Sequence, residues 1–285
     1  MNLPLKFNFS FPEHLKSIAK KIDNGPGVYI FFDQKQYPLY IGKSNHVRSR
    51  LLSHFREFER DSRKTNLLLQ TNTIVHYPTA GSFSALFKEA ELIKQFLPLY
   101  NKRLRQSKNY YTIKINAKGK IEFCQSIDLE YLDSHYGIFL NLSSAKETLT
   151  SLAEYTPVCK YLCGLSNQAP CFQYQLKRCQ KSCGDDNFVK HHPKLLQEYL
   201  AEIRLRQWPY PNQAIAIKEQ DLPTKKVQYI VIYQWCYLGL ANNMAEIEAL
   251  LKQKSIRKFD KNFYQLCVAL FYQTSKEALL LMPVG

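Results

Sequence analysis

The chain has 285 residues, of which 45% are hydrophobic and 13% aromatic, so it holds enough apolar material for two or three small packed domains. No apolar run approaches the roughly 18 residues that a membrane span needs. The first residues, MNLPLKFNFSF, do not have the charged and apolar pattern of a secretion signal. We therefore expect a monomeric, cytoplasmic protein without a membrane segment.

The net charge of +15 is unevenly distributed along the chain. Residues 1–110 carry 18 Lys and Arg against 8 Asp and Glu, a net charge of +10, whereas residues 111–285 carry 21 against 16, a net charge of +5. A basic segment of this kind is typical of proteins that bind the phosphate backbone of nucleic acids. A solvated basic surface that keeps a protein in solution has the same composition, so charge alone leaves both interpretations open.

The segment GPGVYIFFDQKQYPLYIGKS, residues 25–44, predicts an antiparallel hairpin. Its two apolar runs are rich in β-branched and aromatic residues, and the polar DQKQYP between them ends in proline. Because side chains alternate along a strand, Tyr29 and Tyr40 each lie opposite the aliphatic face of their strand. If the register places both tyrosines on one face, their phenols converge on one site, and Gly42 leaves room for a ligand near the backbone.

A helical pattern follows the hairpin. Asn45 is the expected N-cap, and an apolar stripe continues to about residue 58. Arg50 and His54 are four residues apart, so they are neighbours at the edge of this stripe. On its own, Arg50 is best interpreted as a surface cation whose aliphatic stem covers apolar area.

A second helix is predicted over residues 82–97, SFSALFKEAELIKQFL. The pattern places Glu89 near the middle of an apolar arc and Glu91 on the polar side, where it is expected to be solvated. A carboxylate within a buried stripe is unfavourable unless it meets a cation or hydrogen-bond donors. Glu89 is therefore a candidate metal ligand or catalytic acid, with a buried salt bridge as the alternative.

Together, these elements resemble the GIY-YIG nuclease domain, in the version found in the UvrC and Cho excinucleases. The resemblance rests on GVY, YIGKS, an arginine seven residues after the lysine, a helix with E-x-x-L-I-K, and P-x-Y-N at residues 98–101. It implies an α+β fold in which helices flank a small antiparallel sheet, and in which the two tyrosines face the scissile phosphate. It also implies a catalytic site made of Tyr29, Tyr40, Lys43, Arg50, His54, Glu89 and Asn101.

The resemblance assigns Glu89 to one Mg²⁺ or Mn²⁺ ion. It makes Tyr29 the general base, or the phenol that orients the attacking water. An ordinary tyrosine pKa of about 10 leaves the phenol mostly protonated at neutral pH. Lys43, Arg50 and the metal must therefore lower this pKa, unless the phenol acts only by orienting water.

The other residues of the implied site have supporting roles. The resemblance assigns Lys43 and Arg50 to the charge that develops on the phosphate, and Tyr40 and Asn101 to positioning these groups. His54 stands where UvrC proteins often have tyrosine, and its role is left open.

Five of the eight cysteines lie within residues 159–183, CKYLCGLSNQAPCFQYQLKRCQKSC. In a cytosolic protein, such crowding favours metal or iron–sulfur ligation over disulfides, and the spacing does not separate zinc from a cluster. Reduced cysteines of a packed core are the remaining alternative. UvrC proteins have a similar segment associated with a [4Fe–4S] cluster. This resemblance implies ligation by Cys159, Cys171, Cys179 and Cys183, with Cys163 as a spare.

We expect three domains. They are a GIY-YIG nuclease domain at residues 1–110, a UvrC-like linker and cysteine cluster domain at residues 111–190, and a small Cho-like α+β domain at residues 191–285. The resemblance to UvrC covers roughly residues 22–185, and QWCYLGLA is similar to the tails of Cho-like proteins. One nuclease domain implies one incision.

The function implied by the resemblance is nucleotide excision repair. The hypothesis is an endonuclease that nicks damaged double-stranded DNA once, 3′ to a lesion, after UvrA has acted upstream and UvrB is loaded there. Contact with UvrB is expected from residues 111–285, where apolar strands such as YIVIYQWCYLGLA are plentiful. The alternatives are a stand-alone GIY-YIG nuclease for branched or foreign DNA, and a metal-stapled nucleic-acid-binding module with a silent nuclease site.

Overall fold

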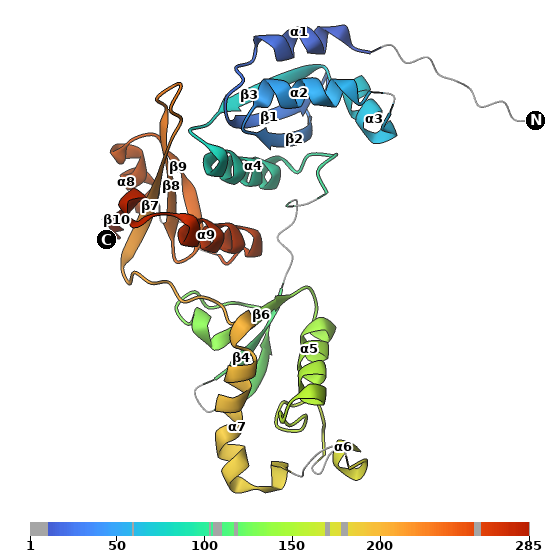
Figure 1. Cartoon of the computed structure of the whole chain (residues 1–285), viewed down its shortest axis with the longest axis vertical. Helices are drawn as coiled ribbons and strands as arrows, with labels where there is room; N and C mark the ends of the chain where they lie inside the picture. The colour runs from blue at the N-terminus through green and yellow to red at the C-terminus, as the bar shows by residue number, and fades with distance from the viewer. Residues whose placement is uncertain are drawn as a thin grey trace, which may run out of the picture. The chain divides into compact units, whose positions relative to one another are not determined.

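The computed structural model describes residues 11–58, 60–102, 104, 110–116, 119–168, 172–177, 182–253 and 258–284 (Figure 1). It divides the chain into two compact units. The first unit combines Met1–Ser107 with Asn212–Gly285, and the second is Lys108–Pro211. The three domains expected from the sequence, with their boundaries at residues 110 and 190, stay a prediction.

The N-terminal part of the first unit is built on a three-stranded antiparallel sheet. In spatial order its strands are β2 (Pro38–Ser44), β1 (Gly27–Phe32) and β3 (Thr73–Pro78), so β2 lies at an edge. The register pairs Tyr29 with Gly42 and Phe31 with Tyr40. Because directly paired residues share a face, Tyr29 and Tyr40 lie on the same side of the sheet. The register therefore meets the condition under which the sequence predicts that the two phenols converge on one site.

Helices cover both faces of this sheet, which confirms the expected α+β arrangement (Figure 1). They are α1 (Glu13–Lys21), α2 (Val47–Arg56), α3 (Ser62–Gln70) and α4 (Ser82–Phe96). The tyrosine face packs against α1, α2 and α3 through buried residues such as Leu15, Leu51 and Leu68. The opposite face packs against α4, where Ile93 contacts the same cluster as Ile30.

The start of α2 differs from the prediction. The N-cap residue is His46, and no side chain within the helix start caps it. Instead, Asn24 reaches across from the segment before β1, and its Oδ1 accepts a hydrogen bond from the backbone N–H of Ser49 at 2.9 Å. The expected N-cap, Asn45, was wrong because the capping amide comes from a distant part of the chain.

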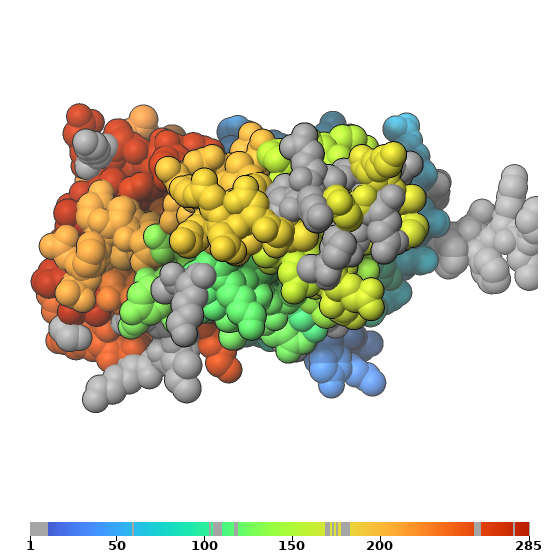
Figure 2. All heavy atoms as spheres, turned by 90° about the horizontal axis from the view of Figure 1, so that it is seen from below, coloured from blue at the N-terminus to red at the C-terminus, as the bar shows by residue number. Residues whose placement is uncertain are grey.

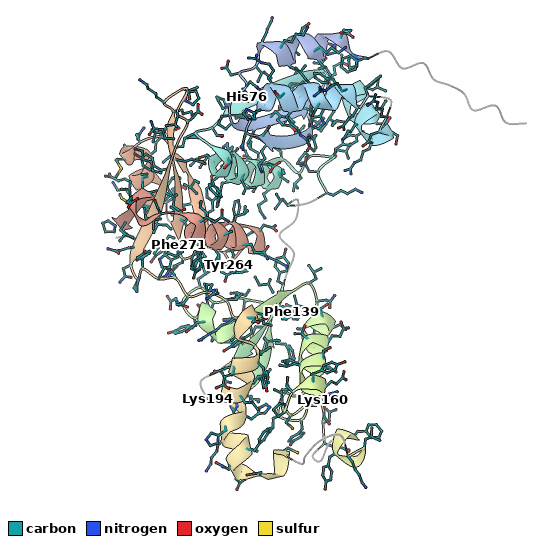
Figure 3. The ribbon with its side chains drawn as sticks, in the orientation of Figure 1. His76, Phe139, Lys160, Lys194, Tyr264 and Phe271 are labelled. Atoms are coloured by element: carbon teal, nitrogen blue, oxygen red, sulfur yellow. The ribbon has the colours of Figure 1, made fainter. Side chains whose placement is uncertain are left out.

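The C-terminal part of the first unit is a four-stranded antiparallel sheet with two helices. The sheet order is β10 (Leu279–Pro283), β7 (Gln213–Gln220), β8 (Val227–Tyr233) and β9 (Cys236–Ala241), and the helices are α8 (Met244–Lys252) and α9 (Lys261–Gln273). Ile230 and Ile232 are fully buried, and Trp235 packs edge-on against Tyr264 and Phe271. Figure 3 shows Tyr264 and Phe271 on α9. These apolar side chains belong to the core, so they do not form the partner surface expected from YIVIYQWCYLGLA.

The second unit contains a three-stranded antiparallel sheet and two longer helices, α5 and α7, of 14 residues each. Its elements are β4 (Tyr111–Ile115), β5 (Ile121–Cys124), η1 (Leu132–Ser134), β6 (His135–Phe139), α5 (Leu142–Tyr155), α6 (Phe172–Gln175), η2 (Ser182–Gly184), α7 (Asp186–Tyr199) and η3 (Ala201–Ile203). Strand β4 lies between β5 and β6. Ile113 of β4, Leu149 of α5 and Leu196 of α7 meet in its core.

Across the ranges given above, no helix combines the length and apolar character needed to cross a lipid bilayer.

Candidate active site

Tyr29 occupies the centre of the candidate site. It projects from β1, and only 1% of its surface is exposed. Its hydroxyl lies 2.9 Å from Nε2 of His54 on α2, and it also forms a hydrogen bond with Arg50 one helical turn earlier. The ring of Tyr40 on β2 lies 6.2 Å from the ring of Tyr29, measured between centroids. Two strands and one helix therefore converge on a single phenol.

Burial decides the protonation state of this phenol. Burial raises the pKa of Tyr29 well above its ordinary value of 10, and the neighbouring Tyr40 raises it further, while Arg50 acts in the opposite direction. The sequence-based expectation was that Lys43, Arg50 and the metal lower this pKa, unless the phenol acts only by orienting water. In the structure desolvation outweighs Arg50, so the protein groups around Tyr29 keep the phenol protonated. A protonated phenol cannot act as a resting base, but it can orient the attacking water and can accept a proton as it passes its own to a neighbouring group.

His54 is a neutral partner for that phenol. Burial, and after it the positive charges of Arg50 and Lys64, lowers its pKa from 6.5 to about 4. At neutral pH the imidazole is therefore uncharged, and one of its nitrogens can accept a proton. The sequence left the role of His54 open, whereas the structure shows that it is the hydrogen-bond partner of Tyr29.

The depressed pKa of His54 predicts a pH-dependent stability. As pH falls from 6.5 to about 4, the unfolded chain binds a proton at His54 before the folded chain does. The free energy of unfolding should therefore decrease over this window, with His54 accounting for about 3 kcal/mol. Denaturant unfolding of His54→Gln should show a weaker dependence on pH. The exposed His46→Gln control should keep the native dependence, and an unchanged profile in His54→Gln would contradict the assignment.

Glu89 reaches the site from α4, on the other side of the sheet. It is half-buried, and burial raises the pKa of its carboxyl, while the charge and backbone hydrogen bond of Lys43 on β2 act to lower it. Within the residues that the structure describes, its carboxylate has no Lys or Arg nitrogen within 4.0 Å, so the alternative of a buried salt bridge is not realised there. A partly desolvated carboxylate without an ion-pair partner is a suitable ligand for a hard cation.

The edge strand β2 brings these two sides together. Electrostatic interaction with Glu89 raises the pKa of Tyr40, after the larger effect of burial, so the carboxylate and the phenol belong to one electrostatic site. Lys43 follows on the same strand and is exposed, as is Arg50 on α2. Both cations are therefore accessible to a phosphate group that approaches the strand edge.

Gly42 has a different task from the one expected. A Cβ atom on this residue would lie 2.5 Å from the Tyr29 hydroxyl oxygen and 2.9 Å from Cε1 of Tyr40. The space left by the missing side chain is thus occupied by the two phenols. The expectation that it admits a ligand was wrong, because the Tyr29 ring already fills it.

Asn101 holds β2 at the position between the site residues Tyr40 and Gly42. Its Oδ1 accepts a hydrogen bond from the backbone N–H of Ile41, and its Nδ2 donates one to the carbonyl of Ile41, both at 2.9 Å. The backbone N–H of Tyr100 donates to the carbonyl of Leu39 at 2.8 Å. The segment after α4 therefore pairs with an edge strand that is otherwise open on this side.

Residues from the C-terminal sheet fix the start of α4, which the sequence did not indicate. The carboxylate of Glu219 on β7 accepts hydrogen bonds from the backbone N–H groups of Phe83 and Ser84, at 3.1 and 2.7 Å. This carboxylate replaces an N-cap side chain and complements the positive end of the helix. Nothing in the sequence links residues separated by some 135 positions.

The middle of α4 also contacts the C-terminal part of the unit. Phe87 packs on Tyr237 with ring centroids 4.9 Å apart, and Lys94 forms an ion pair with Asp260 at 2.5 Å. Glu91 accepts a hydrogen bond from the Tyr237 hydroxyl at 3.4 Å and is half-buried. The prediction that Glu91 is an ordinary solvated residue was wrong, because the polar side of α4 is covered by β9 and α9.

Removing the carboxylate of Glu219 should weaken the contact between β7 and the start of α4. Glu219→Ala leaves two N–H groups at the start of α4 without their partner, so we expect the free energy of unfolding to fall by about 1–2 kcal/mol. Denaturant titration measures this change. The exposed Glu248→Ala on α8 is the matched control and should stay within about 0.5 kcal/mol of the native chain. Equal stability of the two variants would show that the cap is not used.

The structure describes only two of the four predicted cysteine ligands, because Cys171 and Cys179 lie outside the described residues. Cys159 is buried, and its backbone N–H donates to Nε2 of His192 at 3.1 Å, while Cys183 lies in η2. In the described part of the chain, no group of three or more His, Cys, Asp or Glu side chains is arranged to hold a metal. Burial raises the pKa of Cys163 to about 12, so this thiol behaves as a protonated core residue.

Models of three protein families match consecutive parts of the chain. The UvrC-like GIY-YIG domain matches residues 25–102, the UvrC/Cho excinuclease middle domain matches residues 110–202, and the excinuclease Cho C-terminal domain matches residues 214–284. The first of these contains all seven residues of the candidate site.

Curated relatives give the same result. Excinuclease Cho of Escherichia coli is 34% identical over 263 residues, which are 90% of this chain and 86% of that protein. UvrABC system protein C of Shewanella frigidimarina is 31% identical over 171 residues, 59% of this chain and 28% of that protein. The magnesium-bound crystal structure of the GIY-YIG N-terminal endonuclease domain of Thermotoga maritima UvrC is 27% identical. It covers 31% of this chain and 97% of its own, with a TM-score of 0.29.

With one relative this similar over nearly the whole chain, and with all three family models in order, the chain belongs to the excinuclease Cho family and is a GIY-YIG endonuclease of DNA repair.

Proposed function

We propose that the protein makes one metal-dependent nick in damaged double-stranded DNA, 3′ to a lesion at which UvrB is loaded. The observation that carries the chemistry is the half-buried carboxylate of Glu89, which lacks an ion pair among the described residues and is electrostatically coupled to Tyr40 beside the Tyr29–His54 pair. This arrangement supports the assignment of a cation ligand, a proton donor and a proton acceptor to one strand edge. A silent nuclease site has no need of such a set.

Glu89 is the residue that would hold Mg²⁺ or Mn²⁺, and the ion would supply Lewis-acid stabilisation of the phosphate charge. The protein groups handle the proton. The attacking water passes its proton to the Tyr29 oxygen as the phenol proton passes to Nε2 of His54, along a hydrogen bond of 2.9 Å between oxygen and nitrogen. The water oxygen bonds to phosphorus, and the bond from phosphorus to the leaving oxygen breaks. Lys43 and Arg50 stabilise the negative charge that accumulates on the phosphate.

The need for UvrB is supported by the sequence similarity to UvrC, a protein of the UvrABC system, over 59% of the chain. One GIY-YIG match, at residues 25–102, supports a single incision. The basic charge of residues 1–110 supplies affinity for any DNA, but phosphate contacts carry no information about lesions. Specificity for damage is therefore assigned to a partner already bound at the lesion.

The test is the cutting of duplex DNA that carries one lesion and preformed UvrB. We expect cutting with Mg²⁺ or Mn²⁺ and none after chelation with EDTA. Cutting that persists at the same rate in EDTA would contradict the metal-dependent mechanism. Cutting in metal that is unaffected by UvrB would assign the protein to the stand-alone nucleases.

We further propose that Cys159, Cys171, Cys179 and Cys183 ligate a [4Fe–4S] cluster, with one Zn²⁺ as the alternative. The support is the crowding of thiols in a segment matched by the UvrC/Cho middle domain. Anaerobically purified protein should contain about four iron and four sulfide per chain. Cys171→Ser should lose this content and unfold more easily, whereas the control Cys163→Ser should keep it. About one zinc per chain and no iron would replace the cluster with a structural zinc site.

A further inference from the structure

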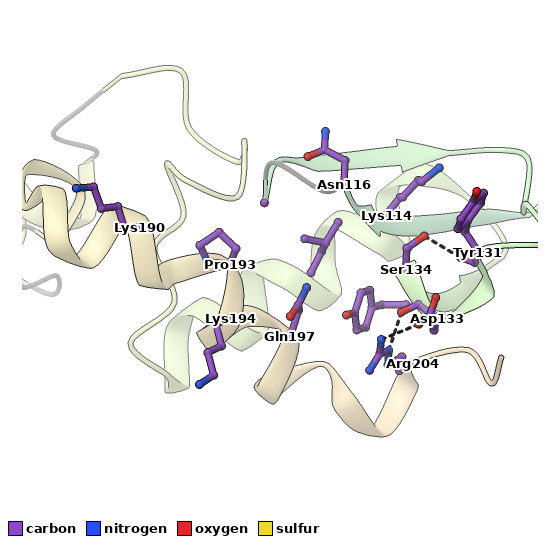
Figure 4. Close-up of a pocket in the computed structure, with 13 residues that line it drawn as sticks. Lys114, Asn116, Tyr131, Asp133, Ser134, Lys190, Pro193, Lys194, Gln197 and Arg204 are labelled. Carbon is purple, nitrogen blue, oxygen red and sulfur yellow. Dashed lines mark hydrogen bonds and ion pairs between the residues drawn. The ribbon is translucent and has the colours of Figure 1, made fainter.

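A groove of about 720 Å³ crosses the second unit, between the sheet and α7. Figure 4 shows Lys114 and Asn116 on its strand side, and Lys190, Lys194 and Gln197 on its helix side. In the space-filling view of Figure 2, the yellow and gold surface of α7 lies beside green residues of the same unit. Every residue that lines the groove belongs to this unit, so the groove is independent of the nuclease site.

The groove is far more basic than the unit that contains it. Residues 108–211 carry 13 Lys and Arg against 10 Asp and Glu, a net charge of only +3. The groove concentrates four of these cations against one carboxylate, and they are Lys114, Lys190, Lys194 and Arg204 against Asp133. Because the unit as a whole is nearly balanced in charge, four cations in one concave place give the groove a positive potential that the average composition does not.

The lysines of the groove are available to a ligand. Lys190 and Lys194 are exposed, and in the described part of the chain they form no ion pair with a carboxylate. Lys160, by contrast, is paired with Glu154 at 3.0 Å, and Figure 3 shows it near the end of α5, whereas Lys194 lies on α7. The positive charge of Lys114 also helps to lower the pKa of His135, after the larger effect of burial.

The spacing along α7 suits a phosphate backbone. Lys190, Lys194 and Gln197 are four and three residues apart, so they lie on one face of the helix and span about 10 Å. Phosphates of one DNA strand follow each other every 3.4 Å or so along the duplex axis, so this face can meet more than one of them. The amide of Gln197 adds a neutral donor of the kind that commonly binds phosphate and sugar oxygens.

The walls of the groove are held by the fold. Gly119, at φ +75°, closes the turn after β4 so tightly that a Cβ atom would lie 2.3 Å from Cγ of Pro193 in α7. On the opposite side, Arg204 donates to the carbonyl and the carboxylate of Asp133, at 2.6 and 3.2 Å. Tyr131 stands at the rim with 59% of its surface exposed. These contacts hold the backbone on both sides of the groove, so a ligand does not have to order it on binding.

We infer that this groove binds the sugar–phosphate backbone of DNA and forms a second DNA contact of the protein, apart from the nuclease site. The inference rests on DNA as the substrate class. Lys190 and Lys194 contact phosphates, Lys114 adds positive potential from the strand side, and Tyr131 offers a flat aromatic surface at the entrance.

The experiment compares two double variants of the full chain, Lys190→Ala with Lys194→Ala and, as the charge-matched control, Lys146→Ala with Lys177→Ala. The control lysines are exposed residues of the same unit that do not line the groove. Binding to an undamaged duplex oligonucleotide is measured in EDTA from 0.05 to 0.3 M salt. We expect the slope of log K against log [salt] to fall by about 2 in the groove variant, which corresponds to roughly 60-fold weaker binding at 0.1 M salt. The control should change by less than about threefold.

Equal weakening of the two variants would overturn the inference, because it would show a diffuse charge effect. Native affinity of the groove variant would overturn it as well. Nuclease activity of both variants is measured in parallel, on the lesion-bearing duplex with UvrB. If the native chain itself does not cut this DNA, the proposed function is wrong. If the native chain cuts and the groove variant keeps the native salt slope, only the inference about the groove is wrong.

Discussion

Replacing Glu89 by Gln, or Tyr29 by Phe, should reduce the rate of DNA cutting by about 10²–10⁴-fold. Glu89→Gln removes the negative charge that would hold the cation, from a carboxylate that has no ion pair among the described residues. Tyr29→Phe removes the hydroxyl that bonds to His54 at 2.9 Å. DNA binding should change little, because neither residue carries the positive charge that attracts phosphates. Single-turnover cutting and equilibrium binding measure the two effects separately.

Glu91→Gln is the matched control for the first of these variants. It makes the same chemical change two residues along α4, where the side chain faces Tyr237 and not the strand edge. We expect nearly native cutting, since glutamine can still accept the Tyr237 hydrogen bond. Comparable rates for Glu89→Gln and Glu91→Gln would remove Glu89 from the chemistry.

Gly42→Ala should abolish most of the activity without touching any charged group. The added methyl group would lie 2.5 Å from the Tyr29 hydroxyl oxygen and 2.6 Å from its Cζ, so the ring must move. Displacing a catalytic group by about 1 Å reduces rates by roughly 100-fold. Cutting of lesion-bearing DNA by the variant, at matched folded fraction, measures the loss.

Gly25→Ala tests whether any added methyl group near β1 has this effect. No atom lies within 4 Å of the Cβ position of Gly25, so this variant should cut at nearly the native rate. Full activity of Gly42→Ala would mean that the phenols need not keep the positions seen here. Equal loss in both glycine variants would point to the backbone and not to Tyr29.

The parts of the site that the sequence predicted are those that local periodicity controls. Alternation along two strands placed Tyr29 and Tyr40 on one face, subject to register, and helical spacing paired Arg50 with His54. These relations depend only on the geometry of single elements. The identity of Glu89 as the unusual carboxylate of its helix followed from the same argument.

The parts that could not be predicted depend on contacts between distant segments. Asn24 caps α2, and Glu219 and Gln228 from the C-terminal sheet bind the backbone at residues 80–84. The pKa of Tyr29 is of the same kind. The sequence supplied nearby cations, but the extent of burial that outweighs them is a property of the packed core.

The most direct measurement maps the incision on a duplex with one lesion, labelled on either strand, with and without UvrA and UvrB. The account predicts one nick, in the damaged strand and 3′ to the lesion, that appears in Mg²⁺ once UvrB is loaded and disappears with Glu89→Gln. Efficient cutting of undamaged or branched DNA without UvrB would contradict it.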